Sequence, residues 1–328
     1  MTPPSFWFSD NVLARFLDPI GRIIGSITTH KIKSARPLRV NVPVICVGNL
    51  TVGGTGKTPI AASIAERLRQ RGNRPAILLR GYGGKLKGPL KVDSRLHTFE
   101  DVGDEALLHA VTTPTWVSAK RALAALEAIK DGADVLVMDD GHQHPSLAKD
   151  LSLVSINGRI GFGNGRITPA GPLREPAESG LRRADAAIVM GGDPHQLSAG
   201  ISKYTPILRA QLVPGPEAKY LKGEKVVAFA GIGDPINFFQ ALAGIGARVV
   251  AAHPFGDHYG YAGADIQTIL DEAFSIGAVP ITTMKDAVRL DPDQRQQVNV
   301  LSVDVEWEDP GALDKLLDRA LESARVRT

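Results

Sequence analysis

The chain has 328 residues, 43% of them hydrophobic and 22% charged, with a net charge of +3 when histidines are neutral. These values are typical of a globular protein of about two domains that buries a core without disulfides. They give no basis for nucleic-acid binding, and no run reaches the roughly 20 apolar residues of a membrane span. The first residues lack the pattern of a secretory signal, so we expect the chain to stay in the cytoplasm, with its single cysteine, Cys46, packed as a small hydrophobe.

Residues 1–40 are expected to form an amphipathic helix. From Phe8 to Ile24, apolar side chains recur at steps of three and four residues, the period of one helical face. The segment up to residue 41 holds six basic and two acidic side chains, a net of +4. Two interpretations stay open. The apolar face packs on the protein's own core, or it lies on a membrane surface with the aromatic run Phe6 to Phe8 in the acyl region and basic side chains near anionic head groups.

From residue 42 onward, short apolar runs rich in β-branched residues alternate with helical stretches. The runs VPVICV, AILLR, TWVS and DVLVMDD read as strands, and PIAASIAERLRQRG reads as a helix between the first two. Continuous apolar runs are typical of strands buried on both faces, so we predict a doubly wound, mostly parallel α/β sheet. A stretch rich in Pro, Gly and charge near 214–225 divides this core, 41–215, from a smaller C-terminal α/β domain, 216–328, which we expect to contribute to the active-site cleft.

The segment TVGGTGKT lies between a predicted strand and a predicted helix, the context that a phosphate-binding loop (P-loop) requires. Its glycines let backbone N–H groups turn toward phosphates, and the helix N-terminus adds partial positive charge. Lys57 is expected to reach the β- and γ-phosphates and the Thr58 hydroxyl to bind Mg²⁺. The general pattern begins with Gly where this chain has Thr51. The candidate nucleotide-binding residues are Thr51, Val52, Gly53, Gly54, Thr55, Gly56, Lys57 and Thr58.

Two acids, Asp139 and Asp140, follow the apolar run DVLVM. In an open α/β sheet, ligands bind at the carboxyl ends of the strands, and a hard cation prefers carboxylate oxygen. We therefore expect one of the two acids to hold Mg²⁺, and the sequence does not decide which. The alternative is a turn or helix cap without a ligand.

Seven motifs in chain order resemble the tetraacyldisaccharide 4'-kinase family of lipid A biosynthesis. They are VGNLTVGGTGKTP at 47–59, RGYGG at 80–84, VGDEALLHA at 102–110, MDDGHQH at 138–144, GPLREP at 171–176, FGDHYGY at 255–261 and TTMKDAVRL at 282–290. The series spans nearly the whole chain and is far more specific than the phosphate loop alone. Two positions depart from the family pattern as we know it: His142 stands where Phe is usual, and Met284 where Glu is common.

The resemblance implies a kinase that uses ATP and Mg²⁺ to phosphorylate the 4'-hydroxyl of a tetraacyldisaccharide 1-phosphate. It also implies a place at the cytoplasmic face of the inner membrane, as a peripheral or monotopic protein without a transmembrane helix and without an obligate protein partner. The N-terminal helix would then bring the site to its lipid disaccharide acceptor. A second hypothesis is a nucleotide-gated switch or chaperone that hydrolyses ATP or GTP to act on a protein partner.

The resemblance also implies roles for individual residues. Asp104 would act as general base, helped by His258, which would orient it or tune its basicity. From the sequence alone, Asp104 reads equally well as a residue that stabilises a helix N-terminus, and His258 as a loop histidine. Residues of second rank for contacts to substrate or phosphate are Arg80, Tyr82, Arg174 and Glu175, the last two with a structural ion pair as the alternative.

Overall fold

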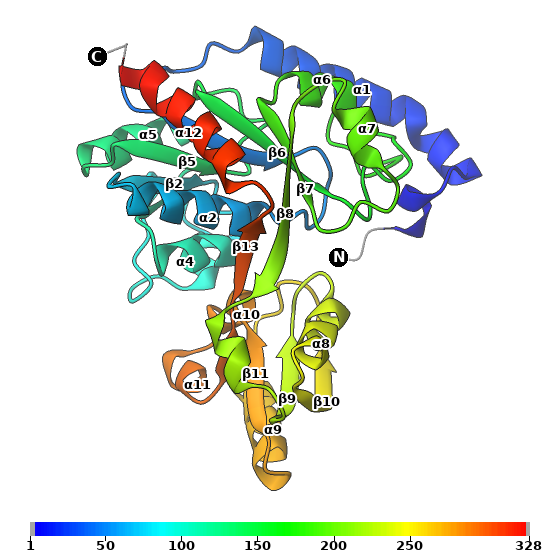
Figure 1. The fold of residues 1–328 in the computed structure, drawn as a ribbon, viewed down its shortest axis with the longest axis vertical. Helices are drawn as coiled ribbons and strands as arrows, with labels where there is room; N and C mark the ends of the chain where they lie inside the picture. The colour runs from blue at the N-terminus through cyan, green and yellow to red at the C-terminus, as the bar shows by residue number, and fades with distance from the viewer. Residues whose placement is uncertain (1–3, 326–328) are drawn as a thin grey trace.

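The computed structural model describes residues 4–325, and these residues form two β-sheets with helices on both faces of each (Figure 1). The larger sheet carries the N-terminal two thirds of the chain together with its C-terminal end. The smaller sheet extends from one side of it. The predicted doubly wound, mostly parallel α/β fold is confirmed.

The larger sheet has nine strands, of which only the two outermost run antiparallel to their neighbours. In spatial order they are β13 (Val303–Trp307), β8 (Ile207–Pro214), β7 (Ala186–Met190), β6 (Leu151–Asn157), β1 (Val44–Asn49), β5 (Val135–Asp139), β2 (Pro75–Leu79), β4 (Thr115–Val117) and β3 (Leu90–Lys91). Along β1, Ile45 and Val47 pack into one hydrophobic cluster and Val44 and Cys46 into the cluster on the opposite face. This two-sided burial explains the unbroken apolar run in the sequence.

Helices cover both faces of this sheet. One face packs against α2 (Lys57–Gln70), α3 (Phe99–Val102), α4 (Asp104–Ala110) and α12 (Pro310–Arg325), and the other against α5 (Arg121–Lys130), α6 (Ala177–Arg182) and α7 (Leu197–Ile201). Because β1 and β5 are parallel neighbours, with Val47 paired to Asp139, their carboxyl ends lie at the same edge. The phosphate loop and the acid pair therefore meet there.

The smaller sheet has four parallel strands in the order β10 (Arg248–Pro254), β9 (Lys225–Ala230), β11 (Val279–Thr283) and β12 (Asn299–Leu301). Around it lie α8 (Pro235–Gly244), α9 (Gly263–Ser275), α10 (Met284–Ala287) and α11 (Pro292–Gln296), and the short 3-10 helix η2 (Pro216–Tyr220) precedes it. Phe229 is fully buried and makes an edge-to-face contact with Tyr261, at a centroid distance of 5.4 Å. This sheet thus has a hydrophobic core of its own.

After β12 the chain returns to the larger sheet. β13 pairs antiparallel with β8, and α12 places Leu313 and Leu317 in the same hydrophobic cluster as α2. A domain boundary near residue 215 stays a prediction. The expected C-terminal unit, 216–328, would include β13 and α12, but in the structure both belong to the larger sheet because their apolar side chains complete its core.

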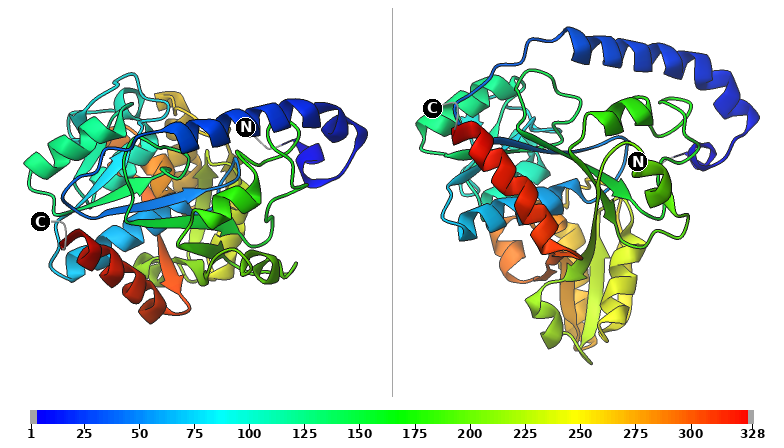
Figure 2. Two further views of the ribbon diagram at one scale, coloured as in Figure 1. Left: turned by 90° about the horizontal axis from the view of Figure 1, so that it is seen from above. Right: turned by 45° about the horizontal axis from the view of Figure 1, so that its top comes forward.

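The helix predicted near the N-terminus is α1 (Val12–Ser34), which crosses the top of the larger sheet in Figure 1 and extends beyond it in both views of Figure 2. Its inner face is made of small residues: a Cβ at Gly21 would lie 2.5 Å from the carbonyl oxygen of Ile167. Its outer face carries large apolar side chains that are largely exposed, including Phe16, 76% exposed, and Ile23, 61% exposed. Among residues 4–325, α1 and the other helices are all too short or too polar to cross a membrane.

The aromatic run before α1 does not behave as one apolar surface. It forms a short 3-10 helix, η1 (Ser5–Phe8), in which Trp7 is buried and its indole N–H donates to the carbonyl of Pro169 at 3.0 Å. The expectation that Trp7 lies in the acyl region is therefore wrong, because this side chain packs against the protein itself. Phe8 stays half exposed.

Candidate active site

The phosphate loop joins β1 to α2 and has the backbone that its glycines predict. Gly53 and Gly56 have φ angles of +112° and +80°, a region that glycine enters without the steric cost of a Cβ. The hydroxyl of Ser155, on β6, donates to the carbonyl of Thr55 and holds the loop against the sheet. Thr51, which stands where the general phosphate-loop pattern has Gly, is buried and forms an antiparallel bridge with Leu173. Thr51 fits at this position because the tight turn of the phosphate loop begins after it.

Lys57, the first residue of α2, points toward the acid pair. Its Nζ lies 4.0 Å from Asp140 Oδ1, and Arg174 Nη1 donates to the same carboxylate at 2.9 Å. Burial would raise the pKa of Asp140, but the charges of Lys57 and Arg174 outweigh it and hold the pKa below its usual value. Asp140 also has a φ of +55°, a strained conformation of the kind that persists at functional sites. Arg174 is thus placed beside the phosphate loop.

Asp139 points into the sheet face covered by α2 and α4, as Val137 does two residues earlier. Its Oδ2 lies 3.0 Å from His109 Nε2, both side chains are 1% exposed, and Asp139 Oδ1 has no hydrogen-bond partner among residues 4–325. A buried carboxylate oxygen without a partner suits Mg²⁺, which usually takes one or two protein carboxylates and completes its shell with phosphates and water. Within residues 4–325 the structure holds no group of three or more metal-binding His, Cys, Asp or Glu side chains.

Asp104 begins α4 and faces the smaller sheet. Its Oδ2 accepts from His258 Nδ1 at 2.8 Å and from Arg289 Nη2 at 2.5 Å, and its Oδ1 accepts from the backbone N–H of Glu105. His258 has a φ of +59°, so the structure holds its backbone in a strained conformation to make this contact. Asp104 and His258, which are 154 positions apart, are brought together as the family resemblance implied.

Positive charge surrounds this carboxylate. Arg289 is fully buried and also donates to the carbonyl of Gly231 and to Asp286, while Lys285 Nζ lies 3.8 Å from Asp104 Oδ2. Burial raises the pKa of Asp104, but the hydrogen bond from His258 and the charges of Lys285 and Arg289 hold it well below its usual range. Arg289 and Lys285 lie in the motif TTMKDAVRL, but no local pattern distinguishes them from its other residues.

The RGYGG loop packs backbone to backbone against the segment that presents Asp104. A Cβ at Gly103 would lie 2.3 Å from the carbonyl oxygen of Tyr82, so only glycine fits at this contact. Arg80 and Tyr82 themselves are exposed, Tyr82 by 77%, and lie at the carboxyl end of β2 as predicted from the sequence. Their side chains are free to meet a ligand.

A buried arginine that sequence patterns did not indicate lies next to this loop. Arg121, the first residue of α5, is 2% exposed, and its Nε and Nη1 atoms have no partner in the part of the chain that the structure describes. Burial lowers its pKa; the charge of Asp140 opposes this shift and the charge of Arg80 adds to it. His144 has its pKa lowered to about 4 by burial and then by Arg121, with Lys31 of α1 also contributing. Unpaired donors in a region of excess positive charge are suited to an anion.

Two other residues have structural partners. Glu175 is fully buried, and Arg183 donates to both of its oxygens at 2.7 and 2.8 Å, so its contacts are those of a structural ion pair. His142 is held by Ser152 and by the carbonyl of Gly180, each at 3.0 Å. Burial lowers its pKa to about 4, so the ring is neutral near pH 7 and its Nε2–H donates to the carbonyl.

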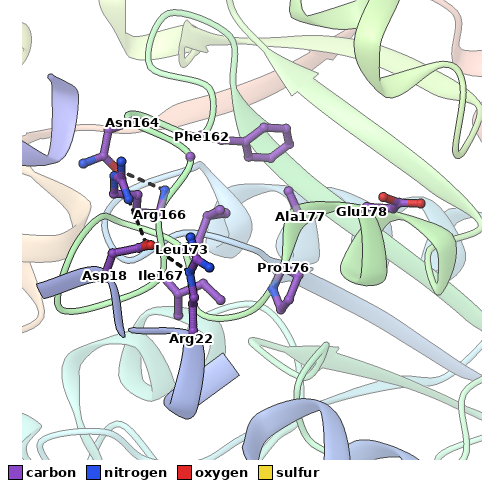
Figure 3. A pocket seen from close by; sticks show the side chains of 11 residues that line it. Asp18, Arg22, Phe162, Asn164, Arg166, Ile167, Leu173, Pro176, Ala177 and Glu178 are labelled. Atoms are coloured by element: carbon purple, nitrogen blue, oxygen red, sulfur yellow. Dashed lines mark hydrogen bonds and ion pairs between the residues drawn. The ribbon is translucent and has the colours of Figure 1, made fainter. Parts of the chain in front are cut away.

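A cavity of about 530 Å³ lies away from these groups, between α1 and the segment 162–178 (Figure 3). Asp18 occupies its α1 side and pairs with Arg22 at 2.8 Å and with Arg166 at 3.0 Å. Its lining contains no residue of the phosphate loop and neither acid of the pair. This cavity is therefore separate from the predicted nucleotide-binding residues.

The site combines a phosphate loop at the carboxyl edge of a parallel sheet, an acid with a free oxygen beside it, and a carboxylate–histidine pair on the adjoining helix and loop. These are the features expected of a P-loop phosphotransferase, which needs a phosphate-binding loop, a metal ligand and a base.

Comparisons with known proteins narrow this class. Residues 13–322 match the family model LpxK, described as tetraacyldisaccharide-1-P 4'-kinase. Proteins named tetraacyldisaccharide 4'-kinase from Rhodospirillum rubrum and Paramagnetospirillum magneticum are 55% and 51% identical to this chain, over 98% and 97% of it and 98% of each relative. A crystal structure of LpxK from Aquifex aeolicus in complex with ATP superposes with a TM-score of 0.74 at 27% identity, covering 94% of this chain and all of that one.

The chain therefore belongs to the tetraacyldisaccharide-1-P 4'-kinase family. The resemblance seen in the seven motifs is confirmed, and so is the expectation of an enzyme that transfers phosphate. The alternative of a nucleotide-gated switch acting on a protein partner is not favoured by these relatives.

Proposed function

We propose that this chain carries out its family's reaction, the transfer of a phosphoryl group from ATP to the 4'-hydroxyl of a tetraacyldisaccharide 1-phosphate, at the edge where β1 and β5 end. One observation carries the proposal: Lys57 and Asp140 lie 4.0 Å apart beside Asp139, whose free oxygen is buried at the same edge. These groups fit the triphosphate and its metal ion together.

Each part of the nucleotide has a residue to receive it. The loop from Thr51 to Thr58 holds the phosphates by its backbone N–H groups, and Lys57 neutralises the β- and γ-phosphates. The hydroxyl of Thr58 and the carboxylates of Asp139 and Asp140 would hold Mg²⁺. When bound, this ion neutralises charge on the transferred phosphoryl group. Arg174 fixes Asp140 through its two hydrogen bonds of 2.9 and 3.1 Å.

The pair of Asp104 and His258 removes the proton of the acceptor hydroxyl. The low pKa of Asp104 keeps it a carboxylate at physiological pH, able to accept a proton but weakly basic alone. His258 Nδ1 lies 2.8 Å from Asp104 Oδ2, and the His258 side chain is 43% exposed, which leaves it accessible to an acceptor. We therefore assign proton removal to the pair acting as a unit.

The phosphate already on the acceptor would bind at Arg121 and Arg80, beside His144, whose pKa of about 4 leaves its ring neutral near pH 7. Arg121 offers two buried N–H donors without partners, and a phosphate supplies charge-matched acceptors for both. Tyr82, exposed on the neighbouring loop, would lie against the sugar.

Kinetics with and without that phosphate test the assignment. Arg121→Gln should raise KM for tetraacyldisaccharide 1-phosphate by about tenfold or more, since a hydrogen bond to a charged group contributes about 1.5–3 kcal/mol, and should leave KM for ATP unchanged. On the acceptor without its phosphate, the wild type and the variant should be equally poor. Lys130→Gln, at the exposed end of the same helix, is the control. An unchanged KM for the phosphorylated acceptor would place its phosphate elsewhere.

We propose further that α1 lies on the cytoplasmic face of the inner membrane with its outer face in the acyl boundary. The exposed apolar side chains of α1 support this, because they gather on the face opposite the buried glycines, and its last turn is basic through Lys31 and Lys33. Replacing Ile23 and Ile27 together with Ser should weaken sedimentation with phosphatidylglycerol vesicles by tenfold or more. Thr29→Ser is the control, and unchanged sedimentation of the double variant would refute the anchor.

A further inference from the structure

His109 is a buried residue that neither the phosphate loop nor the base pair requires. It lies on α4, and its Nε2 approaches Asp139 Oδ2 on β5 at 3.0 Å. Each partner is 1% exposed, and each has a second polar atom, His109 Nδ1 and Asp139 Oδ1, that finds no hydrogen-bond partner in the described part of the chain. The pair therefore makes one contact and leaves two polar atoms unsatisfied.

Such a pair is a poor way to stabilise a fold. Each buried polar atom without a partner destabilises the fold, and two such atoms together outweigh the net gain from one hydrogen bond. The neighbours of His109 on α4, Ala106 and Leu107, pack into the hydrophobic cluster, so an apolar side chain at position 109 would suit this surface better. The polarity at position 109 needs another explanation.

The geometry of the carboxylate supplies one. A metal-ligating carboxylate is ionised and only accepts hydrogen bonds, so Nε2 of His109 must carry the proton that binds Oδ2. With Oδ2 held, the carboxylate cannot rotate, and Oδ1 is fixed in one direction at the edge where β5 ends. Residues that hold a metal ligand in this way typically contribute 10- to 100-fold to metal affinity.

We infer that His109 is a positioning residue for the metal ion of the nucleotide complex. Its Nε2–H holds Oδ2 of Asp139 and leaves Oδ1 to the ion, and because Asp104 begins the same helix, it also fixes the separation of the base from the metal. The inference rests on the proposed role of Asp139 as a metal ligand.

Direct metal binding tests this role without relying on turnover. Mn²⁺ is titrated by electron paramagnetic resonance into the full-length protein with a non-hydrolysable ATP analogue, and binding of the analogue without metal is measured in parallel. His109→Leu should weaken Mn²⁺ binding about tenfold or more and leave metal-free binding of the analogue unchanged. His109→Gln, whose amide can donate to Asp139, should restore affinity to within about threefold.

Two further variants separate a positioning role from a packing role. His142→Phe removes another buried histidine, one whose partners are Ser152 and Gly180. It should leave Mn²⁺ affinity unchanged. His109→Asn keeps a polar side chain that is too short to reach Asp139 and should behave as His109→Leu does. If His109→Leu does not fold, His109→Asn provides the same test.

The outcomes separate the positioning role of His109 from the assignment of Asp139 as a metal ligand. If Asp139→Asn weakens Mn²⁺ binding but His109→Leu and His109→Asn bind as the wild type does, the positioning role is refuted and Asp139 remains a metal ligand. If Asp139→Asn itself binds Mn²⁺ normally, the metal assignment fails and the inference fails with it. Equal losses in the histidine 109 variants and in His142→Phe would show a packing effect and also refute the inference.

Discussion

The two halves of the site are assembled in different ways. The phosphate-binding half, with Lys57, Asp139 and Asp140, belongs to one sheet and is set by the pairing of β1 with β5. The proton-removing half joins two sheets, because Asp104 stands on the larger one and His258 and Arg289 come from the smaller one. Chemistry in the first half depends on a local turn, and chemistry in the second depends on how the two sheets dock.

The largest effect is expected within the single-sheet half. Lys57→Ala removes the cation that meets the β- and γ-phosphates, so turnover should fall at least about a hundredfold, with ATP binding weakened as well. The thermal midpoint should change little, because the Lys57 amine has only the 4.0 Å contact to Asp140. Steady-state kinetics and a thermal shift assay check both halves of this statement, and retained activity would refute the assignment of the loop.

The next effect separates binding from chemistry. Asp104→Asn keeps the size of the side chain but cannot accept a proton, so kcat should fall by about 10²- to 10⁴-fold while the affinity for ATP stays the same. Isothermal titration with ATP and a turnover assay measure the two quantities. Unchanged kcat would show that the pair does not remove the proton, and loss of ATP affinity would show that the two halves are not independent.

The third effect is a loss of folding stability, and it is expected only where the larger and the smaller sheet meet. Arg289→Met leaves the buried carboxylates of Asp104 and Asp286 without their main cation, and breaking a buried pair of this kind costs about 3–5 kcal/mol. Urea unfolding should show this loss at neutral pH. It should shrink on acidification, because a carboxylate with a depressed pKa stabilises the fold above its unfolded pKa and stops doing so once it is protonated.

The contrasting control is an exposed pair within the larger sheet. Arg74→Met removes the contact of Arg74 with Asp134, which is 3.4 Å long and mostly exposed, and should cost less than about 1 kcal/mol. If Arg74→Met lost as much stability as Arg289→Met, the contact between the two sheets would be no more important for stability than an exposed ion pair.

The smallest effect on activity is expected at the buried residue His142. Its pKa is lowered from 6.5 to about 4, so between these values the unfolded chain binds a proton that the folded protein does not. Stability should therefore fall as pH drops through this window, by about 3 kcal/mol for a shift of this size. His142→Phe should flatten that slope and leave turnover nearly unchanged. Urea unfolding between pH 7 and pH 4 provides the measurement, and an equal slope in both proteins would contradict it.

Sequence patterns predicted the first half of the site almost completely. The loop, the strand before it and the helix after it are neighbours in the chain, and the carboxyl ends of parallel strands must meet, so Asp139 could be placed beside Lys57 from the sequence alone. Apolar periodicity predicted α1, α2 and most strands of the parallel sheet for the same reason. Each depends on residues within a few positions of one another.

Contacts between residues far apart in the sequence could not be predicted from such patterns. Arg289 reaches Asp104 across 185 positions, and no neighbouring residue marks this arginine, which lies in the turn after α10, as buried. No sequence pattern indicated that Arg121 is buried or that His109 contacts Asp139. Asp104 and His258 were found only through family resemblance. The return of β13 to the larger sheet was missed because the short run before Trp307 does not show which sheet it joins.

That return makes the order of synthesis important for folding. The strand β13 and the helix α12 occupy the last part of the described chain, and Trp307, Leu313 and Leu317 fill a core whose other members come from strands made much earlier. Until these residues have been synthesised, the core of the larger sheet stays open to water. We therefore expect a chain that ends before residue 303 to be an aggregation-prone polypeptide and not a weakened kinase.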